Sequence, residues 1–449
     1  MDVWGLFLAE DARDFDDAVS MYQKDDGSYM LGVHIADVSH YVRENTYLDR
    51  EALLRGTSVY FTDYTVHMLP EKLSTDICSL KENADRLTLS VLMNISKTGE
   101  FISHEIFPSV IRNKKRFNYK EVQEILDDQN GPYLRELNLL SQLARLLHDI
   151  RHKKGSIDFD IPEPEFELDE KGVPTYMRFK ERLWSHQIIE ECMLMANKTV
   201  ARYIRKEKHK MPFIYRVHDI PEYERIQEWF SYMELLGIKV TRFGIPVTPG
   251  KFQRAFEEAL HQNNSAFIKQ TALQVMMKAK YATEPLGHFG LACKDYTHFT
   301  SPIRRYPDLI VHRLLKKYLM NNKPDLELED HLDTVARISS EAEQRALSAQ
   351  RVYDKIKQMR FLKTKTGEIS EGIITNVTAQ GLQVELRDSC IEGFVPLYSL
   401  KNDYWYFDDR NLTLTGRRTQ SRYKIGDIVT VRIVQIDIQQ LKAEFCLEN

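Results

Sequence analysis

The chain has 449 residues, which at roughly 150 residues per domain suggests two or three domains. Apolar residues make up 43% of it and charged residues 29%, values that are ordinary for a soluble globular protein with a sizeable core. The formal net charge of −4 does not by itself indicate a nucleic-acid partner, because local basic grooves matter more than the total charge.

The five cysteines are scattered along the chain and form neither a CxxC pair nor a Cys/His cluster. A zinc site is therefore not expected, and the unpatterned odd count favours a reducing, cytoplasmic location. No apolar run approaches the roughly 18–20 residues that cross a bilayer. The acidic N-terminal segment does not resemble a signal peptide, so we expect no membrane contact.

The first 120 residues are expected to be rich in strands. Residues 29–42 and 87–95 carry the β-branched and aromatic residues that are typical of strands. From about residue 119 to 363 the pattern becomes mostly helical. Apolar residues within 188–200 fall on one helix face, and an apolar stripe over 335–356 predicts a long helix at about 330–362.

The character of the chain changes again after residue 365. Residues 367–449 combine regularly spaced glycines with the short β-type runs IITNV, LQVEL, FVPL, IVTVRIVQI and AEFCL. Five strands in about 80 residues suit a small closed barrel. We therefore predict two domains, 1–363 and 364–449.

The strongest chemical signal is the acidic segment 10–17, EDARDFDD. Asp14 and Asp16 alternate across Phe15, so in an extended segment their side chains point the same way, whereas Asp17 needs a turn to join them. Carboxylate oxygens are the ligands that Mg²⁺ prefers. The cluster could therefore hold one or two Mg²⁺ ions, or Mn²⁺ in their place, that activate a water. The alternative is a solvated acidic loop.

Several long motifs occur in a fixed order around this segment: DARDFDDA, GVHIADVSHYV, RGTSVYF, GSIDFDIPEPE, IIEECMLMAN, GHFGLA and YTHFTSPIRRYPDLIVHR. Over about residues 8–363 they resemble the catalytic domain of the ribonuclease II/R (RNB) family. The remainder resembles the S1-type barrel that follows this domain in the family. The resemblance implies an α+β fold, in which an RNB-type catalytic domain with a helical body precedes a C-terminal all-β OB-fold barrel.

The same resemblance implies a monomeric 3′-to-5′ exoribonuclease that hydrolyses single-stranded RNA to nucleoside 5′-monophosphates. The family's metal motif runs Asp-x5-Asp-x-Asp-Asp. Asp14, Asp16 and Asp17 match its last three positions, but Leu8 stands at the first and cannot bind a metal. Glu10 or Asp11 could compensate for it. The alternative function is thus an RNA-binding protein or family fragment with a weakened metal site.

Only seven residues precede Leu8, where the family usually carries two cold-shock-type barrels. These barrels help to guide RNA into the catalytic channel. We therefore expect weaker RNA binding, with the S1-type barrel as the main outer clamp.

The segment SPIRRYPD places two arginines before a predicted helix whose first turn suits Pro307 and Asp308. Arginines at such a place can present paired donors to phosphate oxygens. By resemblance, Arg304 would stabilise the charge that develops in hydrolysis, with Arg305 beside it, and Asp16 would help to orient the attacking water. The alternative is a surface pair between arginine and Asp308.

The resemblance also implies aromatic side chains that grip the RNA bases. Tyr60 would stack on one base, and either Phe213 or Tyr215 would form the second clamp. The alternative is that each ring belongs to the core.

Further RNA contacts are expected from polar residues. Glu190 could accept a hydrogen bond from a ribose hydroxyl, which distinguishes RNA from DNA, although a solvated helix face is the alternative. Arg417 and Arg418 lie near the aromatic run 404–407, and interleaved cations and aromatics fit a single-strand surface on the barrel. That run could instead pack back on its own barrel. A DNA-directed nuclease is the remaining alternative, which the S1-type barrel disfavours.

Overall fold

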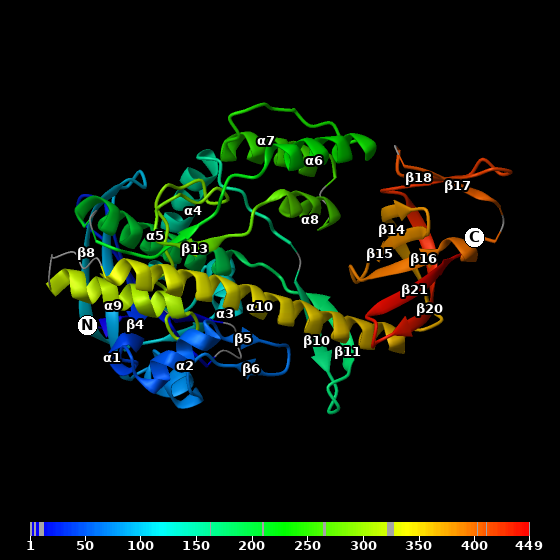
Figure 1. Ribbon diagram of the computed structural model, residues 1–449. Coiled ribbons are helices and arrows are strands. Elements are labelled where there is room, and N and C mark those ends of the chain that lie inside the picture. Colours follow the sequence, from blue (N-terminus) through cyan, green and yellow to red (C-terminus); the bar gives the residue numbers. More distant parts are fainter. Residues whose placement is uncertain are drawn as a thin grey trace.

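The computed structural model describes residues 2–3, 6–8, 13–161, 163–208, 211–263, 266–320, 327–401, 403–409 and 411–448. Side chains are described from residue 13 onward, except that of Glu327. A mixed body of helices and strands is followed by an all-β barrel (Figure 1). The predicted α+β class is confirmed.

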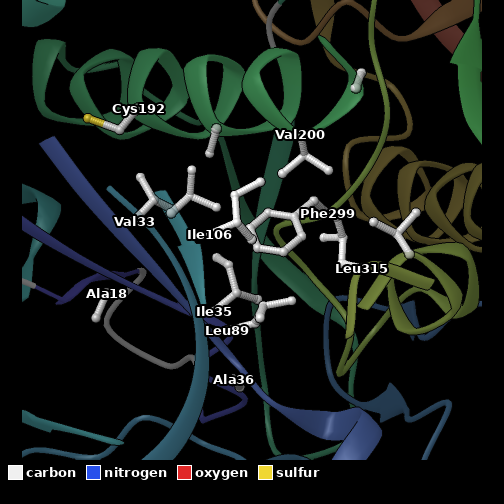
Figure 2. Close-up of a cluster of buried hydrophobic side chains, with 14 of the residues drawn as sticks. Ala18, Val33, Ile35, Ala36, Leu89, Ile106, Cys192, Val200, Phe299 and Leu315 are labelled. Carbon is white, nitrogen blue, oxygen red and sulfur yellow. The ribbon is translucent and has the colours of Figure 1, made fainter. Parts of the chain in front are cut away.

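The body is built on a five-stranded sheet with the order β1-β8-β7-β4-β3. Its strands are β1 (Asp2–Val3), β3 (Asp17–Gln23), β4 (Tyr29–Ala36), β7 (Asp85–Ile95) and β8 (Phe101–Asn113). β4 pairs antiparallel with both β3 and β7, so it lies inside the sheet, and its apolar side chains other than Met30 are buried. In Figure 2, Val33 and Ile35 of this strand lie beneath a helix that carries Cys192 and Val200.

The predicted strand over 29–42 is too long. β4 ends at Ala36, and a short helix, α1 (Val38–Tyr41), follows it. The hydroxyl of Ser39 donates to the Asp37 carboxylate at 2.7 Å. The chain turns here because the backbone N–H groups of His40 and Val42 donate to the carbonyls of Asp37 and Val38 and so leave the strand pairing.

Helices cover the sheet and extend the body. They are α2 (Tyr47–Arg55), α3 (Tyr119–Asp128), α4 (Leu134–Lys153), α5 (Trp184–Glu207), α6 (Tyr223–Leu235), α7 (Pro249–Gln262), α8 (Ala266–Val275), α9 (Tyr306–Met320) and α10 (Glu327–Thr364). The helices expected at 188–200 and 330–362 lie within α5 and α10, which confirms both. In the described part of the chain, no helix is long and apolar enough to cross a membrane.

Four small strand pairs connect these elements. They are β2 (Leu6–Leu8) with β9 (Arg116–Asn118), β5 (Val59–Tyr60) with β6 (Thr65–Val66), β10 (Pro164–Leu168) with β11 (Pro174–Phe179), and β12 (Tyr215–Val217) with β13 (Lys280–Ala282). Two of them matter for the site described below. β2 lies against β3, and the β5–β6 hairpin lies against α10.

The C-terminal barrel is closed and five-stranded, as predicted. Its strands are β14 (Ile369–Thr378), β15 (Gly381–Leu386), β16 (Glu392–Pro396), β20 (Ile428–Asp437) and β21 (Lys442–Leu447). A three-stranded sheet is inserted between β16 and β20, and the sequence did not predict it: β17 (Trp405–Asp408), β18 (Thr413–Gly416) and β19 (Arg422–Lys424). The three strands are only three or four residues long, which is too short for a period-two pattern to stand out.

Helix α10 joins the body to the barrel. Its last turns place Met359, Phe361 and Leu362 in the same apolar cluster as the barrel interior. The first barrel strand begins at Ile369, five residues after the helix ends at Thr364. The exact division of the chain at residue 363 stays a prediction.

Candidate active site

The acidic segment is fixed where the chain enters strand β3. The Phe15 N–H donates to the Ser79 hydroxyl at 3.1 Å, and that hydroxyl donates to the Arg13 carbonyl at 2.8 Å. Asp16 is 3% exposed, and one of its carboxylate oxygens accepts the Ile303 N–H at 2.8 Å. The segment before α9 is therefore brought directly onto the acidic segment, although the two are far apart in the sequence.

Burial dominates the electrostatics of these carboxylates. It raises the pKa of Asp16 well above its ordinary value, and the nearby Arg304 guanidinium opposes that shift. Burial likewise raises the pKa of Asp17 to about 6, again opposed by Arg304. Arg304 Nε lies 3.7 Å from the second Asp16 oxygen. This arginine therefore only partly offsets the cost of burying the Asp16 carboxylate beside the half-buried Asp17.

Asp14 is bound differently from its two neighbours. The Tyr60 hydroxyl donates to Asp14 Oδ2 at 2.5 Å. Burial and the Asp14 charge raise the pKa of this phenol, which keeps it a neutral donor. The Tyr60 carbonyl accepts from the Gln350 amide at 2.8 Å, so the β5–β6 hairpin is tied to α10 as well as to the acidic segment.

The donor chemistry of the cluster fits a hard divalent cation, because carboxylate oxygens are its preferred ligands. The arrangement is incomplete, however. Among the residues with described side chains, no group of three or more His, Cys, Asp or Glu could hold a metal ion. One oxygen of the Asp14 carboxylate is occupied by the Tyr60 hydroxyl. The predicted set of three converging ligands is thus not assembled here; Asp16 is buried, and Asp17 at the start of β3 is half-buried.

The first position of the acidic motif is described only in its backbone. Leu8 ends β2 and pairs with Asn118 of β9, and β2 lies against β3. The backbone at this position is therefore close to the strand that carries Asp17. The Leu8 side chain, Glu10 and Asp11 lie outside the described residues.

The two adjacent arginines face different partners. Arg304 is 43% exposed in its side chain and lies beside Asp16, where it could meet a phosphate. Arg305 forms an ion pair of 2.8 Å with Asp308, which is fully buried in helix α9. The expectation that Arg305 acts beside Arg304 is therefore corrected. Its guanidinium neutralises a buried carboxylate, which fixes the start of α9.

The expected second aromatic clamp is also corrected. Phe213 is 1% exposed and Tyr215 is 6% exposed, and their rings pack edge to face at 5.3 Å in the core. Neither ring presents a face on which a base could stack. The alternative reading, that they are core aromatics, holds in this structure.

A different aromatic cluster, which the sequence analysis missed, lies next to Tyr60. Phe61 stacks on Tyr64 at 4.8 Å and meets Tyr353 of α10 at 4.7 Å. The Tyr353 hydroxyl and Lys357 both bind Asp63 at the tip of the hairpin. The run VYFTDY carried the signal, but only the fold brings α10 against it.

The neighbouring glutamates of α5 also differ from each other. Glu190 is partly exposed and pairs with Arg182 at 2.7 Å, as expected of a helix face near solvent. Glu191 is buried and pairs with Arg151 at 2.7 Å. Nothing in the structure places a ribose against Glu190, so its RNA contact stays a prediction.

On the barrel, Arg417 and Arg418 are exposed on the inserted sheet. A pocket of about 700 Å³ is lined by Arg417, Tyr404, Trp405 and Tyr398. Trp405 packs on Tyr423 at 5.0 Å, whereas Tyr404 is 82% exposed. Trp405 of the aromatic run 404–407 therefore packs back on its own barrel, while Tyr404 and Tyr406 stay exposed, and a contact of this run with RNA stays a prediction.

Comparisons with known proteins identify the two parts of the chain. The RNB domain family matches residues 6–321, and the S1 RNA binding domain family matches residues 363–447. Ribonuclease R of Aquifex aeolicus is 42% identical over 97% of this chain and 62% of its own length. Ribonuclease R 1 of Lactococcus lactis is 39% identical over 95% of this chain and 53% of its own length. The chain thus spans between about half and two thirds of these curated relatives.

Among solved structures, the chain is similar to Mycoplasma genitalium RNase R in complex with ribose methylated single-stranded RNA. The TM-score is 0.92 at 29% identity, over the whole of this chain and 72% of that one. Fold, motif order and domain matches agree with the resemblance drawn from the sequence. The chain belongs to the RNB family of ribonuclease II/R type and carries an S1 RNA binding domain after its RNB domain.

Proposed function

We propose that this protein is a Mg²⁺-dependent exoribonuclease that hydrolyses single-stranded RNA from its 3′ end and releases nucleoside 5′-monophosphates in RNA turnover. One observation carries the proposal. Within the RNB domain, the buried carboxylate Asp16 and its half-buried neighbour Asp17 lie close to the partly exposed guanidinium of Arg304. Carboxylates that can hold a divalent metal ion, next to an arginine that can bind a phosphate, suit phosphodiester hydrolysis.

Each residue of this arrangement has a role in the proposed reaction. Asp16 and Asp17 would hold the divalent cation, with Asp14 as a further ligand. Bound there, Mg²⁺ would polarise the phosphate and lower the pKa of a water. Arg304 stabilises the negative charge that grows on the phosphate oxygens. The Ile303 N–H keeps Asp16 in place through its 2.8 Å hydrogen bond.

The substrate proposal rests on the aromatic side chains and the S1 domain. Tyr60 is 37% exposed beside Asp14, so its ring can meet a base while its hydroxyl stays bound. Stacking contributes about 1–3 kcal/mol per base without regard to base identity, which suits a single strand. A similar structure, that of the Mycoplasma genitalium enzyme, was solved with single-stranded RNA. All five cysteines are free, which supports a reducing, cytoplasmic location.

A second candidate function rests on Leu8. An apolar residue at the first motif position removes one carboxylate ligand. The protein would then bind RNA with little or no hydrolysis.

Degradation of a 5′-labelled single-stranded RNA separates the two candidates. We expect shortening in Mg²⁺ or Mn²⁺ and none in EDTA, with Leu8→Asp as a parallel variant. If only the Leu8→Asp variant shortens the RNA, the natural chain is an RNA-binding protein with a weakened metal site. If neither protein shortens the RNA although both still bind it, the nuclease proposal is rejected.

A further inference from the structure

A second cavity lies in the RNB body, apart from the acidic site. It has a volume of about 910 Å³ and is bounded by α4, α5, the turn between β7 and β8, and the loop 291–295. Helices α4 and α5 lie side by side in Figure 1. Asp14, Asp16, Asp17 and Arg304 do not line this cavity, so it is a separate feature. Its volume lies within the ~300–1,000 Å³ of small-molecule sites.

The walls of this cavity are strongly cationic. Three acidic residues line it, Glu100, Glu191 and Asp295, against six basic ones: Arg151, Lys154, Lys198, Arg202, Arg205 and Lys294. The lining therefore carries a formal excess of three positive charges. This differs from the whole chain, whose net charge is −4. A local concentration of one sign in a concave wall attracts the opposite ion.

Two of the three acids are already neutralised. Glu191 is buried and binds Arg151 at 2.7 Å, and Asp295 is paired with Arg205. Within the described residues, Lys154, Lys198 and Lys294 make no ion pair. Lys198 is the central one, because it lies on α5 one turn after Leu194 and two turns after Glu191, all on the cavity wall. Burial lowers the pKa of its ammonium group.

The remaining wall is apolar and partly aromatic. It includes Phe101, Ile150, Leu194 and Met195. The Arg202 guanidinium lies over the Phe101 ring at 5.4 Å from its centroid, which holds this cation at the cavity edge. A ligand that fits has a compact anionic group for the lysines and a flat, less polar part for this wall.

We propose that the cavity binds a mononucleotide, with its phosphate among Lys154, Lys198 and Lys294 and its base against the apolar wall. The inference goes beyond the proposed exoribonuclease activity and does not depend on it. Charge-assisted hydrogen bonds from lysine to phosphate are among the stronger polar contacts in proteins. The site needs no divalent cation, since the lysines supply the positive charge.

Isothermal titration of the full chain with AMP in EDTA at low salt tests this inference, because it measures binding in the absence of hydrolysis. We expect AMP to bind, and adenosine to bind about tenfold more weakly or less, since it lacks the phosphate. Inorganic phosphate should compete with AMP but bind more weakly, because it has no part for the apolar wall. Lys198→Met should weaken AMP binding by about tenfold.

Three further variants make the result decisive. Lys442→Met, on an exposed barrel position, and Asp16→Asn, in the acidic site, should leave AMP binding unchanged. Lys294→Met alters an exposed side chain and reports on the same site if Lys198→Met fails to fold. The inference is overturned if AMP does not bind, if adenosine binds equally well, or if Asp16→Asn rather than the lysine variants removes binding. If RNA oligonucleotides bind but AMP does not, the inference is also overturned, and the cavity wall is instead a surface that binds the RNA sugar-phosphate backbone.

Discussion

Arg304 and Arg305 are adjacent in the sequence, yet the fold gives them different environments. Arg304 projects its half-exposed side chain toward Asp16, whereas Arg305 neutralises the fully buried Asp308. The isoleucine before them also takes part, since its N–H binds Asp16. Of these three consecutive residues, Ile303 positions the Asp16 carboxylate, Arg304 lies beside it with a half-exposed side chain, and Arg305 supports the start of α9.

This division predicts opposite outcomes for two matched substitutions. Arg304→Met should slow RNA cleavage by about 10²–10³-fold and should cost less stability than Arg305→Met, because the Arg304 side chain is 43% exposed and lies 3.7 Å from the Asp16 carboxylate. Arg305→Met should lower the free energy of unfolding by about 3–5 kcal/mol, because it leaves Asp308 buried and unpaired. Single-turnover cleavage and chemical denaturation measure the two effects. Equal losses of stability in both variants would contradict the assignment.

A buried acid in the barrel gives a pH-dependent prediction. Burial and repulsion by Glu392 raise the pKa of Glu385 to about 7, while Lys355 opposes the shift. The fold therefore favours the protonated form, so this residue's contribution to stability is present below pH 4.5 and is lost as the pH rises through 7.

Glu385→Gln should remove this loss of stability at high pH, because glutamine has no carboxyl group to ionise. Urea denaturation between pH 4.5 and 8 should find the variant similar to the natural chain at the lowest pH and more stable at the highest. A difference between the two proteins that does not change with pH would contradict the raised pKa.

At the scale of elements, periodic apolar patterns predicted the long helices and the five barrel strands, because each pattern extends over several turns or residues. The pairing of distant segments was not predictable in this way. The hydrogen bond of Ile303 to Asp16 and the contacts of the β5–β6 hairpin with Tyr353 arise only from tertiary packing. Burial of Phe213 and Tyr215 has the same origin, since a short β-type run does not reveal which of its faces is covered.

The barrel offers a test of close packing between two strands. A Cβ added at Gly393 of β16 would lie 2.2 Å from the Phe445 ring of β21. Gly393→Ala should therefore destabilise the protein by about 1–3 kcal/mol through overpacking. Gly244→Ala is the control, because its Cβ would meet no atom within 4 Å. Thermal melting of the two variants measures the difference, and equal melting temperatures would refute the packing argument.

At the scale of the whole molecule, α10 connects the acidic site with the barrel. Its middle contacts the Tyr60 hairpin through Gln350 and Tyr353, and its end shares a core with the S1 domain. RNA held by the barrel and RNA held at the acidic site would therefore be set at a fixed separation. The barrel should contribute affinity, and the RNB body should contribute chemistry.

Tyr404 tests this division of labour. Its exposed ring lies beside Arg417 on the barrel, so Tyr404→Ala should weaken binding of a long single-stranded RNA by about 1–3 kcal/mol. The cleavage rate of bound RNA should not change. Tyr22→Ala, an exposed tyrosine on β3, is the matched control. Filter binding and single-turnover cleavage provide the two readouts, and a slower cleavage step in Tyr404→Ala would contradict the separation of roles.

The most direct test of the central claim compares the natural chain with Asp16→Asn on a 5′-labelled single-stranded RNA in Mg²⁺. We predict that the natural chain shortens the RNA progressively from its 3′ end and releases nucleoside 5′-monophosphates. The Asp16→Asn variant should still bind the RNA and leave it intact. Equal degradation by the two proteins would contradict a catalytic role of Asp16 and place the chemistry elsewhere.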